Sequence, residues 1–316
     1  MYKLENRLTS FSNFIGQDKI IQTLKAMINS TLVQETSFPH TLIYGAPGMG
    51  KTTLASIIAN ELQVNIHYIQ GANIEKKSDL ISVLSLIQEN DIVFIDEIHS
   101  INKNVIEFLY NAMEDFVFDL ILGVDDNAKA MRMRIKPFTL IGATTKLNDI
   151  AQPLKDRFGY LARVVDYTDE NINQIIEKTS QDNNIEISKN SISLISKYSR
   201  QTPRLANNLL FRVNDFAISE NSGIIDTKII HTTFKSLDLY EYGLTKDHIE
   251  YMQILYEGFD ELSVALDTIC GLVLHSKETI VNEIEPILLF HKFILKTSRG
   301  RKITQKGIEY LKRQRL

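Results

Sequence analysis

Residues 45–52 read Gly45-Ala46-Pro47-Gly48-Met49-Gly50-Lys51-Thr52 and fit the P-loop pattern G-x-x-x-x-G-K-[ST]. The apolar run Thr41-Leu42-Ile43-Tyr44 precedes this segment, and apolar residues at helical spacing follow it. In such a loop the glycines let backbone N–H groups point at a phosphate, and the positive end of the following helix faces the same anion. The segment therefore predicts a nucleotide-phosphate site between a strand and a helix.

The residue types of this loop predict ATP and Mg²⁺ as cofactors. Lys51 is expected to neutralise the β- and γ-phosphates, and the Thr52 hydroxyl to bind Mg²⁺. Gly48, Gly50 and Thr53 complete the residues of the loop that we expect to contact the nucleotide. A chance glycine-rich loop is the alternative, and the correct flanking strand and helix disfavour it.

The first half of the chain alternates apolar runs with helical patterns, which is typical of a parallel sheet wrapped by helices. Besides residues 41–44, the runs Ile92–Ile95 and Phe138–Ile141 predict buried strands. Helical periodicity dominates from Ile172 to Ser236, with breaks at residues 182–184 and 202–203. The sequence thus predicts an α/β P-loop core over residues 1–165 and a small helical lid domain over 166–239.

The last part of the chain, residues 240–316, begins with helices and ends in a predicted β-hairpin. Its two strands lie near Phe293–Thr297 and Lys302–Thr304, with a basic, glycine-containing turn between them. Helices followed by such a hairpin indicate a winged-helix domain.

Charge is unevenly distributed along the chain. The net charge is −4, but residues 290–316 carry nine Lys or Arg and one acid, which gives +8 there and about −12 elsewhere. This asymmetry points to a polyanion bound near the C-terminal part, and a solvated helical tail is the equally open alternative.

Composition, with 44% hydrophobic and 23% charged residues, is that of an ordinary globular protein. No signal peptide and no apolar run of about 18 residues is visible, so we expect a cytoplasmic protein without a membrane span. The single cysteine, Cys270, excludes an internal disulfide, and we expect it to be a small buried residue.

Asp96 and Glu97 end the second predicted strand, at the edge of the sheet where ligands bind in parallel α/β folds. Phosphoryl transfer to water needs a carboxylate for the metal and a group that orients the water. We assign the first role to Asp96 and the second to Glu97. An acidic pair that caps the following helix is the alternative. His99 is interpreted as a structural hydrogen-bonding residue.

Several ordered segments resemble the RuvB family of AAA+ ring ATPases, which drive branch migration of Holliday junctions. Besides the P-loop, these segments are Phe14-Ile15-Gly16-Gln17, Asp96-Glu97-Ile98-His99, Gly142-Ala143-Thr144-Thr145, Pro153-Leu154-Lys155-Asp156-Arg157-Phe158-Gly159, Thr202-Pro203-Arg204 and Thr297-Ser298-Arg299-Gly300-Arg301. The resemblance covers essentially the whole chain and implies a homohexamer.

The resemblance also implies roles for individual residues. Thr145, with Thr144 as the adjacent candidate, would be the polar sensor of the γ-phosphate. Arg157 would be an arginine finger that reaches the ATP of a neighbouring subunit, and Arg204 a second sensor. The residues that would frame adenine and ribose are Arg7, Phe14, Ile15, Tyr167 and Pro203. For either arginine, an ordinary surface ion pair is the alternative.

The resemblance further implies three partners. An insertion at residues 115–135 predicts a hairpin with an exposed apolar tip, which in this family docks a RuvA-like protein; a hairpin packed on its own domain is the alternative. Lys296, Arg299 and Arg301 in the wing would contact the DNA backbone of a duplex or Holliday junction, independently of sequence. A RuvC-like resolvase is a further candidate partner.

Five positions depart from the family pattern without removing a reacting group: Leu8, Ala46, Ser100, Gln201 and Ser298. Ser100 and Gln201 put subunit contacts and lid flexibility in doubt. Two other functions remain open, a clamp-loader-like ATPase switch and an ATP-binding winged-helix regulator of DNA. The absence of a zinc module and of a Ser-Arg-Cys finger motif disfavours the first, and the presence of Glu97 and Arg157 disfavours the second.

Overall fold

The structure is a computed structural model that describes residues 8–122, 129–259, 262–273 and 275–314. Side chains are described outside residues 119–130 within these ranges. The chain divides into two compact units, one with the residues up to Thr179 and Gln201–Asn207, the other with Ser180–Arg200 and the residues from Asn208 onward. No helix in the described ranges is both long and apolar enough to cross a membrane.

A five-stranded parallel sheet forms the centre of the first unit, with strand order β2-β3-β6-β1-β7. Its strands are β1 (Thr41–Tyr44), β2 (Ile66–Gln70), β3 (Ile92–Asp96), β6 (Thr139–Thr144) and β7 (Tyr160–Arg163). The three strands predicted from apolar runs are the three central ones, and their residues are almost all buried. The two edge strands were not predicted.

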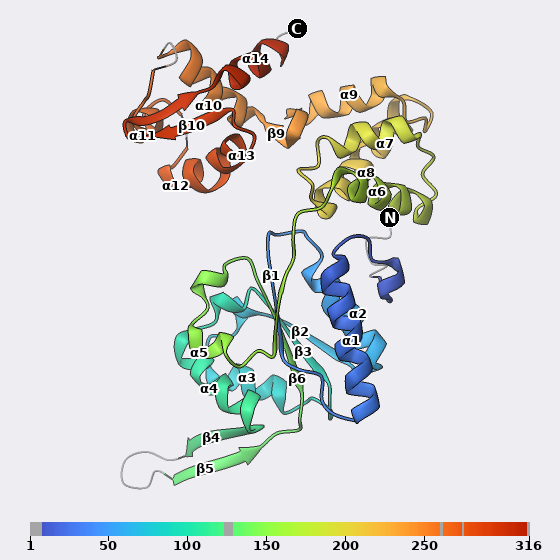
Figure 1. Ribbon diagram of the computed structural model, residues 1–316, viewed down its shortest axis with the longest axis vertical. Coiled ribbons are helices and arrows are strands. Elements are labelled where there is room, and N and C mark those ends of the chain that lie inside the picture. Colours follow the sequence, from blue (N-terminus) through green and yellow to red (C-terminus); the bar gives the residue numbers. More distant parts are fainter. Residues whose placement is uncertain (1–7, 123–128, 260–261, 274, 315–316) are drawn as a thin grey trace. The chain divides into compact units, whose positions relative to one another are not determined.

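Helices cover both faces of this sheet (Figure 1). One layer holds α1 (Asp18–Gln34) and α2 (Lys51–Leu62), and the other holds α3 (Lys77–Leu84), α4 (Lys103–Glu114) and α5 (Gln152–Lys155). Short 3-10 helices occur at η1 (Phe11–Asn13), η2 (Gly71–Asn73), η3 (Ile98–Ser100) and η5 (Leu147–Asp149). Apolar residues of α3, α4, α5, β3 and β6 form one continuous buried cluster. This packing fixes the ends of β3 and β6, where the candidate site lies.

The expected insertion is an antiparallel hairpin of β4 (Val117–Leu122) and β5 (Lys129–Arg134). At its base Phe118 is completely buried and stacks on Phe108 of α4, with ring centroids 4.4 Å apart. Met131 on the second strand is 44% exposed. The base of the hairpin is therefore packed on its own domain. Its expected apolar tip, at residues 123–127, lies outside the described residues.

Helices dominate the segment after β7. They are α6 (Asp169–Asp182), α7 (Lys189–Ser196), α8 (Pro203–Glu220) and α9 (Thr227–Ser236), which confirms the predicted helical breaks at residues 182–184 and 202–203. A further break between α8 and α9 was not predicted. The domain boundaries expected at residues 165 and 239 stay predictions.

The C-terminal part folds as a winged helix. It contains β8 (Leu239–Tyr240), η6 (Glu241–Gly243), β9 (Leu244–Thr245), α10 (Lys246–Glu257), α11 (Leu266–Cys270), α12 (Lys277–Thr279), the π-helical turn η7 (Ile280–Ile284), α13 (Glu285–Phe290), β10 (Ile294–Thr297), β11 (Gly300–Ile303) and α14 (Gln305–Gln314). Strands β10 and β11 form the expected antiparallel wing. Cys270 packs against this core but is only half-buried, because it lies at the exposed end of the short helix α11; the expectation of full burial was wrong.

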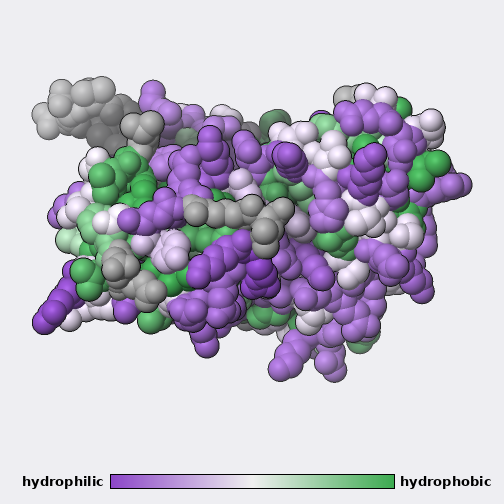
Figure 2. Space-filling model, turned by 90° about the horizontal axis from the view of Figure 1, so that it is seen from above, coloured by the Kyte–Doolittle hydropathy of each residue, from purple (hydrophilic) through white to green (hydrophobic). Residues whose placement is uncertain are grey.

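Hydrophilic residues make up most of the face that Figure 2 draws. Figure 2 shows a face on which hydrophobic residues are scattered among hydrophilic ones. Scattered exposed apolar residues are normal on folded proteins and need no partner to explain them. Polar side chains converge at the carboxyl ends of the central strands β3 and β6.

Candidate functional site: a nucleotide site at the ends of the central strands

The P-loop joins the central strand β1 to helix α2. Gly48 and Gly50 have φ angles of 77° and 94°, in the left-handed region that glycine adopts without steric cost. A Cβ atom on Gly50 would lie 3.1 Å from the ring of Phe14, so a side chain there is also obstructed by space. The two glycines let the loop close tightly over the start of α2, as a phosphate-binding backbone requires.

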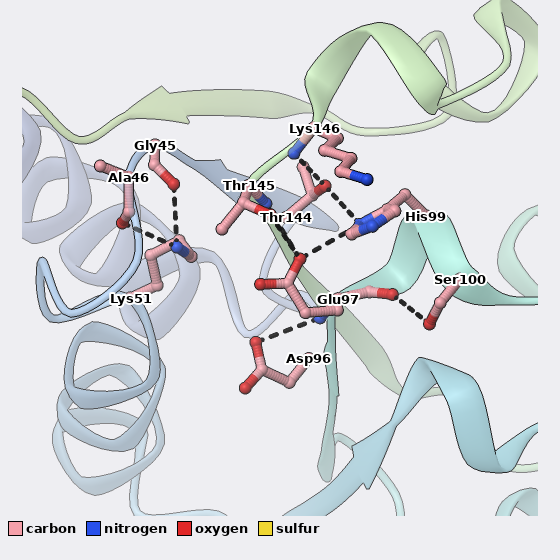
Figure 3. A network of polar contacts seen from close by, with 10 residues as sticks. All are labelled: Gly45, Ala46, Lys51, Asp96, Glu97, His99, Ser100, Thr144, Thr145 and Lys146. Atoms are coloured by element: carbon pink, nitrogen blue, oxygen red, sulfur yellow. Dashed lines mark hydrogen bonds and ion pairs between the residues drawn. The ribbon is translucent and has the colours of Figure 1, made fainter. Parts of the chain in front are cut away.

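Lys51 is buried at the first position of α2, with 7% of its surface exposed. Its ammonium donates to the carbonyl oxygens of Gly45 and Ala46 at 2.9 and 3.0 Å (Figure 3). Burial lowers the pKa of Lys51, and the nearby carboxylates of Glu97 and Asp96 oppose this shift. The loop thus holds a cation with neutral carbonyl partners, which fits a site for a triphosphate.

Glu97 comes directly after β3 and has a left-handed φ of 47°, which turns the chain out of the strand. Its carboxylate oxygen Oε2 accepts hydrogen bonds from the backbone N–H and the hydroxyl of Thr145, at 3.1 and 3.0 Å. Thr145 follows the neighbouring parallel strand β6. The structure thus brings together Glu97 and Thr145, which lie far apart in sequence, at the carboxyl ends of adjacent strands (Figure 3).

Asp96 ends strand β3, and one of its carboxylate oxygens accepts the Glu97 N–H at 3.1 Å. Thr52 lies in the first turn of α2 and is half-buried, as is the adjacent Thr53. A carboxylate and a hydroxyl are oxygen donors, which Mg²⁺ prefers. The donor set of Asp96 and Thr52 therefore fits the magnesium ion expected from the sequence.

His99, which the sequence predicts to be a structural hydrogen-bonding residue, belongs to the same network. Its Nδ1 atom lies 3.0 Å from the hydroxyl of Thr144 and 3.1 Å from Oε2 of Glu97. Thr144 is completely buried, and its hydroxyl also accepts the N–H of Lys146. His99 thus bridges the ends of β3 and β6 beside Glu97. Two sequence signals pointed to His99: it lies two positions after Glu97, and it belongs to the family-like segment Asp96-Glu97-Ile98-His99.

Two aromatic residues, Phe14 and Tyr167, lie beside Gly50 of the P-loop. Tyr167 is buried, its hydroxyl donates to the Met49 carbonyl at 3.2 Å, and burial raises its pKa to about 12. Phe14 lies against Gly50, while Ile15 and Pro203 are half-buried. Phe14 and Tyr167 thus both border Gly50. The expected adenine and ribose pocket, with Ile15 and Pro203 as further members, stays a prediction. Arg7 lies outside the described residues.

Arg204 lies in the first turn of helix α8 and contacts the P-loop. Its backbone N–H donates to the Gly48 carbonyl at 3.3 Å, and a Cβ atom on Gly48 would lie 3.0 Å from the Arg204 side chain. Its positive charge is close enough to lower the pKa of Lys51. The proposed second sensor is therefore adjacent to the loop whose phosphates it would detect.

Arg157 follows α5 and contacts helix α4. Its Nη2 atom donates to Glu114 at 3.0 Å, its Nη1 atom donates to the Pro153 carbonyl at 2.7 Å, and its guanidinium lies 4.4 Å from the centre of the Tyr110 ring. Its Nε–H is buried without a partner among the described residues. These contacts are with α4 and its own turn; none that the structure describes is with Lys51 or Glu97.

The three basic wing residues differ in their surroundings. Lys296 and Arg301 are directly opposite each other in the hairpin and both bind Glu285 of α13, at 2.8 and 2.6 Å. Glu285 is completely buried and also accepts the hydroxyl of Tyr251 at 2.8 Å. Arg299 is exposed in the turn of the wing, and only its backbone N–H has a described hydrogen bond. The expected DNA contacts of all three residues stay predictions.

Burial raises the pKa of the Glu285 carboxyl, but hydrogen bonds from Arg301, Lys296 and Tyr251 outweigh burial and hold it below its ordinary value. Glu285 is therefore the buried anion of the wing. Sequence reasoning missed it, because Glu285 precedes the wing by nine residues or more and nothing in its local pattern marks it as buried.

The fold and the site together define a P-loop ATPase of the AAA+ class. The defining features are the parallel sheet, the P-loop after β1, the acidic residues at the end of β3, the helical segment and the winged helix. Three family models match successive parts of the chain: the Holliday junction DNA helicase RuvB P-loop domain at residues 6–164, the RuvB AAA lid domain at 167–240 and the RuvB C-terminal winged helix domain at 241–312. The chain belongs to the RuvB family.

Individual relatives agree with this assignment over the whole chain. Proteins named Holliday junction branch migration complex subunit RuvB from Mycoplasmopsis synoviae and Mycoplasmopsis pulmonis are 63% and 49% identical, over 97% and 98% of this chain and 97% and 99% of theirs. The solved Thermotoga maritima RuvB Holliday junction branch migration motor is 34% identical with a TM-score of 0.81, over 97% of this chain and 98% of that one. The resemblance found in the sequence is confirmed.

Proposed function

We propose that this chain hydrolyses ATP to drive duplex DNA through a four-way junction, as the motor subunit of Holliday junction branch migration. The main support is that family models of all three RuvB domains match this chain in order. In the same chain the P-loop, Asp96, Glu97 and Thr145 lie together at one edge of the sheet. Of the functions considered from the sequence, this one accounts for the winged helix together with a nucleotide site that carries a carboxylate, Glu97, placed to orient water.

In the proposed reaction the residues of this chain hold and orient the reactants. Lys51 exchanges its carbonyl partners for the β- and γ-phosphates, because formal negative charges bind an ammonium more strongly than neutral carbonyls do. Asp96 and Thr52 would hold Mg²⁺, which neutralises charge on the phosphates. Glu97 orients the attacking water and accepts its proton. Thr145, already bonded to Glu97, limits where that carboxylate points.

Completion of the site requires a second copy of the chain. Arg157 has no described contact with the nucleotide site of its own subunit, and a guanidinium supplied by a neighbour would stabilise the charge of the transition state. We therefore propose a ring, as a homohexamer, in which Arg157 acts on the neighbouring ATP. Arg204 would report the state of the γ-phosphate to the lid.

DNA and a RuvA-like protein are the proposed partners. A cytoplasmic location is proposed with them. The wing would contact the phosphate backbone through exposed cations, of which Arg299 is the clearest. The β4–β5 hairpin would dock the RuvA-like protein. A RuvC-like resolvase would act on the same junction.

Branch migration of a synthetic four-way junction tests the proposal. The chain, a RuvA protein from the organism of one of its relatives, ATP and Mg²⁺ are expected to convert the junction into duplex products. Glu97→Gln is expected to abolish the conversion while keeping ATP binding. A wild-type chain that hydrolyses ATP but leaves the junction intact would contradict the motor function.

A further inference from the structure

The surroundings of Arg157 form a defined pocket for its guanidinium. We call the Tyr110 ring, the Glu114 carboxylate and the Pro153 carbonyl the arginine seat. Tyr110 lies under the plane of the guanidinium at 4.4 Å, while the two oxygens bind its two terminal nitrogens at 3.0 and 2.7 Å. A ring face restricts the tilt of the flat group, and two acceptors restrict its rotation. The arginine seat therefore limits both the tilt and the rotation of the Arg157 guanidinium.

The seat is not built for stability alone. The Arg157 Nε–H is buried without an acceptor among the described residues, although a guanidinium has five donors to satisfy. Glu114 is 54% exposed and Arg157 22% exposed, so this ion pair is partly hydrated and contributes little to folding. An arrangement that orients Arg157 while leaving one donor unpaired indicates a positional role.

Two of the three parts of the seat belong to helix α4. The side of α4 that faces the core is buried from Val105 to Met113, so the helix is anchored along its length of about 18 Å. Its N-terminal end follows Glu97 after the short η3, and its C-terminal end continues through Phe116 into β4. One anchored helix thus connects the carboxylate of its own ATP site, the seat of Arg157 and the base of the hairpin.

We propose that Tyr110 and Glu114 are positioning residues for Arg157, which hold its guanidinium in the orientation that it needs to reach the ATP of a neighbouring subunit. The proposal deepens the proposed function and rests on it, because Arg157 acts in trans only in a ring.

Glu114→Gln tests the ion-pair part of the seat. The variant keeps the shape of the side chain and removes its charge, and we expect kcat for ATP to fall by roughly tenfold to a hundredfold, as for a misplaced catalytic group, with an unchanged KM. Glu107→Gln is the matched control, because Glu107 is exposed on the same helix and no described hydrogen bond or ion pair joins it to Arg157. It should retain the wild-type kcat.

Mixed rings separate a positional effect from simple damage. Lys51→Ala subunits have a disabled ATP site but an intact seat, so mixing them with Glu114→Gln subunits should restore hydrolysis per active site, as it should for Arg157→Ala. Damage inside the Glu114→Gln subunit would not be repaired by a neighbour. A fall in kcat that such mixing fails to reverse overturns the proposal.

Tyr110 supplies a second variant pair. Tyr110→Phe keeps the ring and is expected to keep activity, whereas Tyr110→Leu removes the ring face and should lower kcat with the same rescue by Lys51→Ala subunits. If Arg157→Ala abolishes hydrolysis while Glu114→Gln and Tyr110→Leu are both normal, the seat is wrong and the ring motor stands. If Arg157→Ala is itself normal, both the seat and the shared site fail.

Discussion

The nucleotide site and the wing both present cations toward an expected polyanion, but they hold these cations differently. Lys51 is bonded to two uncharged carbonyls of the P-loop. Lys296 and Arg301 are bonded to Glu285, a buried carboxylate. A phosphate displaces a neutral carbonyl more readily than it displaces a paired anion, because only the second exchange leaves a buried charge without a partner. Charge counted in a sequence is therefore an upper limit on charge available for binding.

The largest expected effect is a loss of ATP hydrolysis, and it tests the nucleotide site. Glu97→Gln removes the proposed general base and should lower kcat for ATP by about 10² to 10⁴-fold while leaving the affinity for ATP unchanged. Steady-state hydrolysis and fluorescent-nucleotide binding measure the two effects. Glu89→Gln, at an exposed position before β3, is the control and should behave as wild type. Normal turnover in Glu97→Gln would remove Glu97 from the reaction.

The second prediction tests the wing side. Glu285→Gln leaves Arg301 and Lys296 without their buried anion, and breaking such a network costs about 3–5 kcal/mol of unfolding free energy. Chemical denaturation measures this loss of unfolding free energy. Glu278→Gln, which is exposed on α12, is the control. A loss below about 1 kcal/mol would show that the wing cations are not held by Glu285.

The winged helix should also depend on pH through His248. Burial lowers its pKa to about 4, so between pH 6.5 and pH 4 the unfolded chain binds a proton that the folded chain excludes. Stability therefore falls as the pH falls through this window, by at most about 3.4 kcal/mol at 1.36 kcal/mol per pKa unit. Denaturation midpoints of wild type and His248→Gln measure it. Equal pH dependence in the two proteins would exclude His248 as the cause.

The contrast also explains what the sequence could predict. The three central strands and the roles of the P-loop follow from apolar runs and local spacing, which are properties of contiguous residues. Strands β2 and β7 were missed, because both are edge strands in which polar or exposed residues interrupt the apolar run. Edge strands bury fewer side chains, and so their sequences carry a weaker pattern.

Besides the edge strands, the sequence also left unpredicted the contacts between residues that are far apart along the chain. The contact of Glu97 with Thr145 follows from neighbouring parallel strands, but the contact of His99 with Thr144 and the seat of Arg157 depend on how loops pack. Glu285 is of the same kind. The sequence placed Arg301 in the turn of the wing, whereas in the structure it lies on β11 directly opposite Lys296. Like charges in that position are destabilising unless an anion lies between them, and the misplaced strand hid this signal.

The smallest expected effect distinguishes the wing cations from one another. Arg299 is exposed in the turn, whereas the Arg301 side chain is 17% exposed and its charge is compensated by Glu285. Arg299→Ala should weaken duplex binding regardless of sequence and reduce the salt slope of the affinity by about 1, the value for one lost phosphate contact. Arg301→Gln should leave the slope nearly unchanged while lowering the stability of the winged helix. Fluorescence anisotropy over a salt titration measures both slopes, at a temperature where circular dichroism shows each variant to be folded. Equal reductions for the two variants would mean that DNA phosphates displace Glu285 from Arg301, and the contrast between the two sites would then disappear in the DNA complex.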